Sequence, residues 1–229
     1  MRPAAKERAV PELQIATVPV TPFQQNCALI WDSTTRLGAV IDPGGEVERI
    51  LAAIARVGLS VETILLTHGH LDHAGGAAAL QRALRRQSGD ETAAPIVGPD
   101  RRDAFLLEGI ARQAAAYGLD GMENATPDRF LSAGETVTIG GHEFAVIHCP
   151  GHTPGNVVFF SAEARFAVVG DVLFRGSIGR TDFPYGDHAA LIGAITHELL
   201  PLGDDVAFLC GHGPGSTFSE ERRSNPFLR

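Results

Sequence analysis

The stretch LLTHGHLDHAGG, residues 65–76, places His68, His70, Asp72 and His73 within six positions. Imidazole and carboxylate side chains are the protein groups that bind zinc, and they also suit iron and manganese. A buried cluster of imidazoles without a metal ion would need a hydrogen-bond partner for every ring nitrogen. The types and spacing of these residues therefore predict a metal site, and with it hydrolytic or oxidative chemistry.

Three further side chains of the same kind follow short apolar runs, His152 after FAVIHCPG, Asp171 after FAVVG and His212 after AFLCG. A strand fixes the position of its end, and a glycine lets the backbone turn so that the next side chain points into a shared cleft. Seven ligands exceed what one tetrahedral ion uses. We therefore expect two divalent ions roughly 3.5–4 Å apart, bridged by one carboxylate. Zinc is the expected metal, with iron or manganese as alternatives.

The elements that must position these residues are read from hydrophobic periodicity. Apolar residues in EVERILAAIARVG have helical spacing, and Gly58 follows as a C-terminal cap. Expected strands are 13–20, 26–31, 37–42, 61–67, 95–98, 135–141, 142–150, 156–162, 165–171 and 205–213. Expected helices are 46–58, 75–87, 100–120 with Asp100 as N-cap, 186–203 and a polar C-terminal helix over 216–223. Many short strands with helices early, in the middle and late suggest two sheets with helices outside.

Length and composition limit the class of protein. The 229 residues, 44% hydrophobic and 20% charged, suit one globular domain over 1–229. The net charge of −8 argues against a nucleic-acid partner. No apolar run is long enough for a membrane helix. The three cysteines form no disulfide framework, and residues 1–20 lack the apolar core of a secretory signal, so a cytoplasmic location is expected.

The H-x-H-x-D-H stretch, followed in order by GHTPG, GD and GHG, resembles the metallo-β-lactamase superfamily over nearly the whole chain. This resemblance implies an α+β fold, a four-layer αββα sandwich with the metals at one edge. It also implies two ligand sets and a bridge: His68, His70 and His152; Asp72, His73 and His212; and Asp171 between them.

Within the superfamily, QNCALIWD, VIDPGG, GDVLFRGSIGRTDFPYGD and GHGPGSTFSEERRSNPFL are similar to glyoxalase II-type hydrolases, in the short subgroup without a C-terminal helical domain. The resemblance implies hydrolysis of a small-molecule thioester such as S-lactoylglutathione by a metal-bound hydroxide, with Asp72 and Asp171 in catalytic roles. Arg175 or Arg180 could meet a substrate carboxylate. The alternative for Arg180 is a structural pair with Asp182.

Other functions stay open at this point. A persulfide dioxygenase of the same superfamily also carries a GRTDF stretch and uses one iron held by two histidines and a carboxylate. A lactonase attacks a similar acyl carbon. A β-lactamase, a nuclease and a non-enzymatic binding module are less favoured. The oligomeric state is not predicted.

Overall fold

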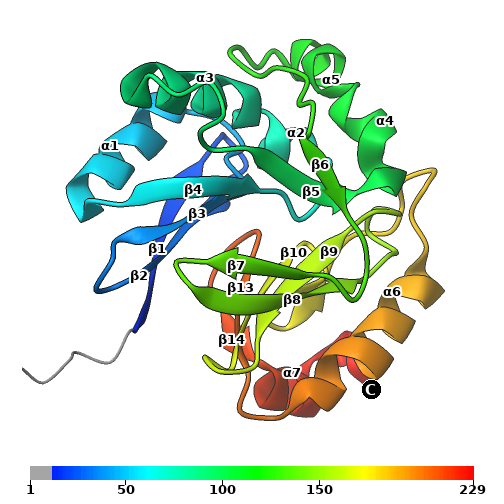
Figure 1. Cartoon of the computed structure of the whole chain (residues 1–229). Helices are drawn as coiled ribbons and strands as arrows, with labels where there is room; N and C mark the ends of the chain where they lie inside the picture. The colour runs from blue at the N-terminus through cyan, green and yellow to red at the C-terminus, as the bar shows by residue number, and fades with distance from the viewer. Residues whose placement is uncertain (1–11) are drawn as a thin grey trace, which may run out of the picture.

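The computed structural model of the chain describes residues 12–229. The prediction about a secretory signal rests mainly on residues outside this range. Two six-stranded sheets pack face to face, with helices on both outer surfaces (Figure 1). The predicted α+β fold and its four-layer αββα sandwich are thus confirmed. Within the described residues, no helix combines the length and apolar character needed to cross a membrane.

The first sheet has its strands in sequence order. Its first three strands are antiparallel and its last four run parallel, so β3 belongs to both sets. The strands are β1 (Leu13–Val20), β2 (Gln25–Asp32), β3 (Leu37–Ile41), β4 (Ser60–Leu65), β5 (Ile96–Asp100) and β6 (Arg129–Leu131). The carboxyl ends of parallel neighbours meet at one edge of a sheet, so the loops after β3, β4 and β5 are brought together.

The second sheet has the order β14-β13-β10-β9-β8-β7 and is antiparallel except for the pair β10 and β13. Its strands are β7 (Thr136–Ile139), β8 (His142–His148), β9 (Val157–Ser161), β10 (Phe166–Gly170), β13 (Ala207–Cys210) and β14 (Ser216–Thr217). A small hairpin of β11 (Leu173–Phe174) and β12 (Ser177–Ile178) follows β10. The parallel pair β10 and β13 delivers the residues that follow them to the same edge.

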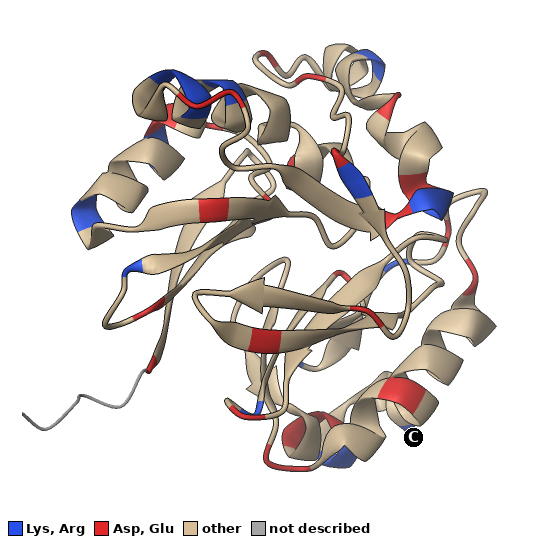
Figure 2. Ribbon diagram, viewed as in Figure 1, with Lys and Arg blue, Asp and Glu red and all other residues tan. Residues whose placement is uncertain are grey.

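The helices lie on the outer faces of the two sheets (Figure 1). The helices associated with the first sheet are α1 (Val47–Val57), α2 (Leu71–Ala74), α3 (Ala77–Ser88), α4 (Ala104–Leu107) and α5 (Ile110–Tyr117). Those of the second sheet are α6 (His188–Ala194), continued by a π-helical turn (Ile195–Leu199) and a 3-10 turn (Leu200–Leu202), and α7 (Phe218–Ser224) with a 3-10 turn (Pro226–Leu228). Charged residues gather on helices and loops, while most strand residues are uncharged (Figure 2).

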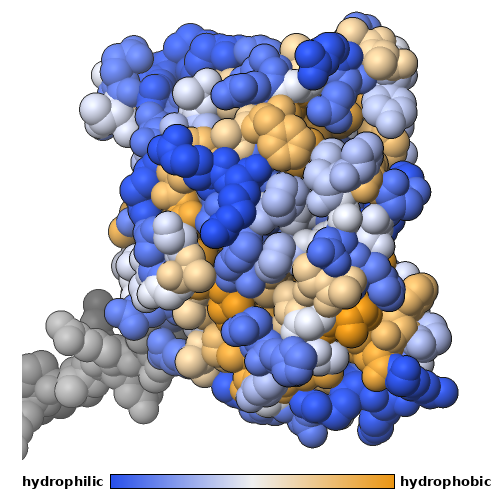
Figure 3. Space-filling model, turned by 90° about the vertical axis from the view of Figure 1, so that its right-hand side faces the viewer, coloured by the Kyte–Doolittle hydropathy of each residue, from blue (hydrophilic) through white to orange (hydrophobic). Residues whose placement is uncertain are grey.

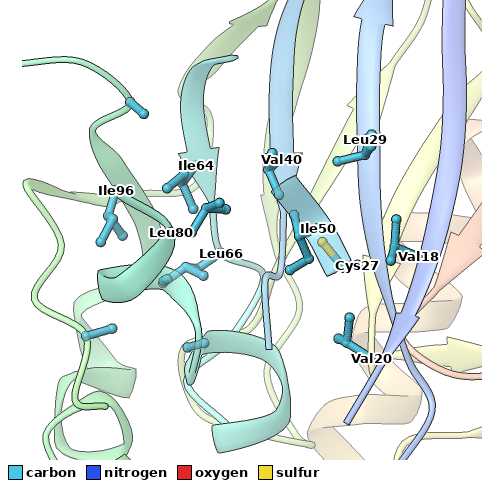
Figure 4. Close-up of a cluster of buried hydrophobic side chains, with 14 of the residues drawn as sticks. Val18, Val20, Cys27, Leu29, Val40, Ile50, Ile64, Leu66, Leu80 and Ile96 are labelled. Carbon is cyan, nitrogen blue, oxygen red and sulfur yellow. The ribbon is translucent and has the colours of Figure 1, made fainter. Parts of the chain in front are cut away.

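Strand periodicity divides the core into layers. Along β2, Ala28 and Ile30 face the other sheet, whereas Cys27, Leu29 and Trp31 pack against the helices, as the two-residue repeat of a strand requires. Figure 4 shows the outer cluster, in which Leu29 and its neighbours meet the helical layer. A third cluster fills the space between the second sheet and the C-terminal helices.

The predicted single helix over 100–120 is wrong. Asp100 ends β5, and its carboxylate accepts a hydrogen bond from the Arg102 backbone N–H at 3.0 Å, which caps a 3-10 turn (Arg101–Asp103). The helical segment then breaks at Gly109, which separates α4 from α5. Glycine disfavours a helix interior more than any other residue except proline. The 3-10 turn places a buried aspartate, Asp103, against the ligand loops.

Candidate metal centre

The structure brings all seven predicted ligands to one edge of the sandwich. His68 follows β4, His70 precedes the short helix α2, and Asp72 and His73 lie on the first turn of that helix. The other three follow or connect strands of the second sheet: His152 between β8 and β9, Asp171 after β10, and His212 after β13. Metal binding by these side chains is a prediction, and the distances between their ligand atoms are compared with it below.

Two groups of three ligands lie next to each other. In the first, His70 Nδ1 lies 3.1 Å from His68 Nε2 and 2.9 Å from His152 Nε2. In the second, His212 Nε2 lies 3.3 Å from Asp72 Oδ2, and His73 completes the set. Within each group the ligand atoms are all within 4.8 Å of one another. These are the same two sets that the family resemblance implies.

Asp171 contacts both groups. Its carboxylate oxygens lie 3.3 Å from His73 Nε2, 3.5 Å from His212 Nε2 and 3.5 Å from His152 Nε2. Gly211, which directly precedes His212, makes this approach possible, because a Cβ at this position would lie 2.1 Å from Asp171 Oδ1. A carboxylate in this position fits the predicted bridging role.

The five histidines all turn one ring nitrogen outward to a hydrogen-bond acceptor. The acceptors are Thr67 Oγ1 for His68 (3.1 Å), Tyr185 Oη for His70 (2.9 Å), Asp42 Oδ2 for His73 (2.8 Å), the Arg180 carbonyl for His152 (2.8 Å) and the Phe23 carbonyl for His212 (3.1 Å). With the ring proton on the outer nitrogen, the inner nitrogen presents a lone pair. Such partners orient metal-binding histidines in proteins.

Two inner atoms are left without a partner. His73 Nε2 and Asp171 Oδ1 are buried and lack a hydrogen-bond partner among the described residues, although they lie 3.3 Å apart. Burying polar atoms without partners costs about 1–3 kcal/mol each. Lone pairs of nitrogen and carboxylate oxygen that converge in this way fit divalent cations. The residues present therefore match a two-metal centre.

Protonation differs between the two groups. Burial lowers the pKa of His70 to about 3, and it lowers the pKa of His68 well below the ordinary value, so both imidazoles are neutral. Burial also opposes protonation of His212, but hydrogen bonds with Asp171 and Asp72 outweigh it and raise its pKa to about 9. Burial opposes protonation of His73 too, but the carboxylates of Asp171, Asp72 and Asp42 outweigh it and raise the His73 pKa well above the ordinary value. In the metal-free chain the second group can thus hold a proton, which a bound cation would displace, where the first cannot.

Sequence reasoning missed Asp42, which holds His73. Asp42 follows β3 and is 2% exposed; its Oδ1 accepts from the Thr67 backbone N–H at 2.7 Å, and its Oδ2 accepts from the Thr67 hydroxyl at 2.5 Å. The signal was present, because Asp42 follows an apolar strand as Asp171 does. It is included among the predictions only as the last residue of the strand expected over 37–42.

Asp103 was also missed. Its carboxylate accepts hydrogen bonds from the Gly69 N–H at 2.9 Å, the Thr153 hydroxyl at 2.7 Å and the Gly155 N–H at 2.6 Å. It therefore ties the loop of His68 and His70 to the loop of His152. No spacing in the sequence pointed to it, since it lies in the segment predicted as a continuous helix.

The predicted substrate-binding arginines lie differently. Arg180 lines a pocket beside the ligands, but its Nε and Nη2 each lie 2.7 Å from a carboxylate oxygen of Asp182. This is the pairing foreseen as the alternative. Arg175 is exposed on the turn of the β11–β12 hairpin and does not line the pocket. A role for either in substrate binding stays a prediction.

The pocket opens at the edge of the sandwich and has a volume of about 610 Å³. His70, Asp72, Asp171 and His212 lie at its base, and aromatic side chains form much of its wall. The edge toward which β4 and β5 point faces the viewer in Figure 3, where exposed hydrophobic residues are interspersed with hydrophilic ones. A small molecule in this pocket would reach the ligand cluster.

Comparison with known proteins agrees with this geometry. Residues 20–212 match the family model described as the metallo-beta-lactamase superfamily. The hydroxyacylglutathione hydrolase GloC of Haemophilus influenzae is 48% identical over 217 residues, covering 94% of this chain and 98% of that protein.

Two crystal structures are similar in fold. The structure of TTHA1623 in a di-iron-bound form is 38% identical with a TM-score of 0.80, covering 93% of this chain and 100% of that one. The structure of the BLEG-1 B3 metallo-beta-lactamase is 33% identical with a TM-score of 0.81, covering 94% and 99%. With the sandwich, the ligand geometry and the family match in agreement, the chain belongs to the metallo-beta-lactamase superfamily.

Proposed function

We propose that this chain is a metal-dependent thioester hydrolase that cleaves an acyl-glutathione such as S-lactoylglutathione into a free thiol and a hydroxy acid. The observation that carries the proposal is the pair of adjacent three-ligand groups, with the Asp171 carboxylate within 3.5 Å of a histidine nitrogen of each group. It favours two cations over one. The relative named hydroxyacylglutathione hydrolase, 48% identical, supports the substrate class.

Zinc is the cation we propose, with iron or manganese as alternatives, since imidazole and carboxylate ligands suit all three. His68, His70 and His152 would hold one ion, and Asp72, His73 and His212 the other, with Asp171 shared. Two bound cations supply a nucleophile at neutral pH, by lowering the pKa of water, and offset negative charge on an acyl oxygen.

The chain's own residues do the positioning. Outer hydrogen bonds from Asp42 and Tyr185 hold the rings of His73 and His70, so that their inner nitrogens keep fixed directions. The carboxylates of Asp72 and Asp171 lie on the pocket side, where they can accept a hydrogen bond from water and orient it. A thiolate leaving group needs no strong general acid, because its parent thiol has a pKa of about 8.5.

The pocket suits a small molecule, which we propose as the partner of this chain. The ligand cluster is accessible through this pocket, which His70, Asp72, Asp171 and His212 help to line. The cytoplasmic location, like the single domain over 1–229, stays a prediction from the sequence.

The two alternatives make different demands on the site. A persulfide dioxygenase needs one iron with open positions for O₂, and the complete second group of Asp72, His73 and His212 favours a second ion instead. A lactonase needs the same cations but a ring ester. Direct assay separates these reactions.

The test is loss of thioester absorbance with S-lactoylglutathione. We expect turnover by the zinc-loaded chain, its disappearance after chelator treatment, and recovery when zinc is restored. Asp171→Ala, which removes the shared carboxylate, should lower turnover to below about one-hundredth. The proposal is wrong if the folded variant keeps the wild-type rate, or if the loaded chain consumes oxygen with glutathione persulfide and leaves the thioester intact.

A further inference from the structure

The β11–β12 hairpin forms one side of the pocket beside the ligand cluster. Phe174, Ser177 and Ile178 of this hairpin line the pocket, and the Phe174 ring centroid lies 6.2 Å from that of His212. We call these three lining residues the hairpin wall. Each strand of the hairpin has only two residues. An isolated pair of short strands is marginally stable at best in water, so contacts with other elements must hold the hairpin wall in place.

The C-terminal end of the chain supplies these contacts. Glu221 Oε2, on α7, accepts hydrogen bonds from the Gly176 backbone N–H at 2.8 Å and from Asn225 Nδ2 at 2.9 Å. Asn225 Nδ2 also donates to the Ser177 carbonyl oxygen at 3.0 Å. Two side chains from the end of the chain therefore hold one N–H and one carbonyl group at the tip of the hairpin.

Both side chains are fully buried. Glu221 and Asn225 are each 0% exposed, and the other carboxylate oxygen of Glu221 accepts from the Ser216 hydroxyl at 2.5 Å. Burial of a carboxylate is costly unless hydrogen bonds satisfy it, and hydrogen bonds to a charged group are stronger than neutral ones. A buried carboxylate whose hydrogen bonds reach the pocket hairpin indicates that the position of this hairpin matters.

The local sequence explains why Asn225 turns back toward the hairpin. A proline disfavours helical backbone at the residue before it, and Asn225, before Pro226, has φ −68° and ψ 119°. Its Oδ1 accepts from the Phe227 N–H at 3.0 Å. The Nδ2 group is then directed to Glu221 and to the Ser177 carbonyl.

The base of the hairpin is fixed separately, beside the predicted bridging ligand Asp171. Gly179, directly after β12, donates its N–H to the Val172 carbonyl at 3.2 Å. Its backbone passes so close to Asp171 that a Cβ at Gly179 would lie 1.9 Å from the Asp171 carbonyl oxygen. Because Glu221 and Asn225 act at the tip and not at this base, loss of their contacts should move the hairpin wall and leave the metal ligands in place.

We infer that Glu221 and Asn225 are positioning residues for substrate binding, because they hold the hairpin wall at the shape that the substrate meets. The inference rests on the proposed thioesterase function and concerns the pocket of that same site. A wall that contacts substrate and transition state equally contributes uniform binding, which lowers KM and leaves kcat unchanged.

The first test is steady-state hydrolysis of S-lactoylglutathione by the zinc-loaded chain. We expect Glu221→Ala and Asn225→Ala to raise KM at least about fivefold and to keep kcat within about twofold. Zinc affinity, measured by chelator competition, should stay at the wild-type value in both variants.

Two further variants separate positioning from general loss of stability. In Glu221→Gln the amide oxygen can accept from Gly176 and Asn225 while the NH₂ group donates to the Ser216 hydroxyl, so KM should stay close to the wild-type value. Thr217→Ala is the matched control. It removes the hydroxyl that caps α7 by accepting from the Glu220 N–H at 3.2 Å, and so destabilises the same helix without removing a hydrogen bond to the hairpin. Its KM should be unchanged.

The second test does not need turnover. Amide hydrogen exchange, followed by NMR, reports the Gly176 N–H directly, and we expect it to exchange at least about tenfold faster in Glu221→Ala than in the wild type or Glu221→Gln. Isothermal titration with S-methylglutathione, a stable thioether, should give a dissociation constant at least about fivefold higher in Glu221→Ala.

The outcomes distinguish this inference from the proposed function. If the wild type hydrolyses no thioester but binds the thioether more tightly than Glu221→Ala does, the proposed function fails and the positioning role stands. The inference is overturned if Glu221→Ala keeps the wild-type KM and dissociation constant, or if Thr217→Ala raises KM equally. Equally fast Gly176 exchange in the wild type and Glu221→Ala, or a loss of zinc affinity in Glu221→Ala, also overturns it.

Discussion

Replacing Asp42 by asparagine should weaken metal binding through the ring proton of His73. Asp42 Oδ1 faces the Thr67 N–H, and Oδ2 faces both the Thr67 hydroxyl and His73 Nδ1. The asparagine amide can take two orientations. If its NH₂ replaces Oδ1, two donors, the NH₂ and the Thr67 backbone N–H, face each other. If its NH₂ replaces Oδ2, it must donate to His73 Nδ1, which moves the ring proton of His73 to Nε2. That atom lies 3.3 Å from Asp171 Oδ1, on the side where the cation is proposed.

The size of the effect follows from these contacts. Loss of an outer partner of a metal-binding histidine typically lowers metal affinity 10–100-fold, which equals about 1.4–2.7 kcal/mol. Because the metal-free chain also loses hydrogen bonds to a charged group, we expect its free energy of unfolding to fall by about 1.5–3 kcal/mol.

The assay is competition with a chromophoric zinc chelator, which reports the affinity for each ion separately. Asp32→Asn is the matched control. Asp32 is also a buried carboxylate at a strand end, accepts from the Thr34 and Thr35 N–H groups, and lies 3.4 Å from His142 Nε2, but it contacts none of the predicted ligands. It should lower stability and leave both zinc affinities unchanged. The reasoning is refuted if Asp42→Asn binds both ions like the wild type, or if the control weakens them equally.

Two further predictions concern buried titratable groups. Burial raises the pKa of Asp103 from 3.8 to about 6, against the opposing effect of its three hydrogen bonds, so between these values the folded chain binds more protons than the unfolded chain. This stabilisation is complete below about pH 4 and is lost as the pH rises through 6. Urea unfolding should show that the wild type loses about 3 kcal/mol of unfolding free energy between pH 4 and 7, relative to the non-titrating variant Asp103→Asn. A difference between the two proteins that stays constant with pH would contradict this prediction. The three cysteines are buried and burial raises their thiol pKa values, that of Cys210 to about 11; a thiol reagent should therefore leave the native chain unlabelled and label it after unfolding, and rapid native labelling would argue against this environment.

The fold was largely predictable from local pattern. Alternation in β2 and helical spacing in α1 arise from burial of one face, which a sequence displays directly. The segment after β5 was not predictable in the same way. Its apolar residues have helical spacing, but Gly109 and the contacts of Asp103 decide where the helix starts and breaks, and those contacts come from loops more than thirty residues away.

For the candidate site, the sequence showed which side chains can bind a metal, because ligand type and strand-end position are local properties. It did not show their outer partners. Tyr185 meets His70 across 115 residues and Asp42 meets His73 across 31, so only the folded sheets reveal these contacts. The rings of Phe183 and Tyr185, which stack beside His70, were missed for the same reason, since these residues show no periodic pattern.

The most direct test of the central claim is the number of zinc ions that the active chain needs. We would titrate the chelator-treated chain with zinc, follow S-lactoylglutathione hydrolysis, and measure bound metal at each point by mass spectrometry of the intact protein. The account predicts full activity at two ions per chain, and only one retained ion in His212→Ala. Full activity at a single ion per chain, with the second group empty, would contradict it.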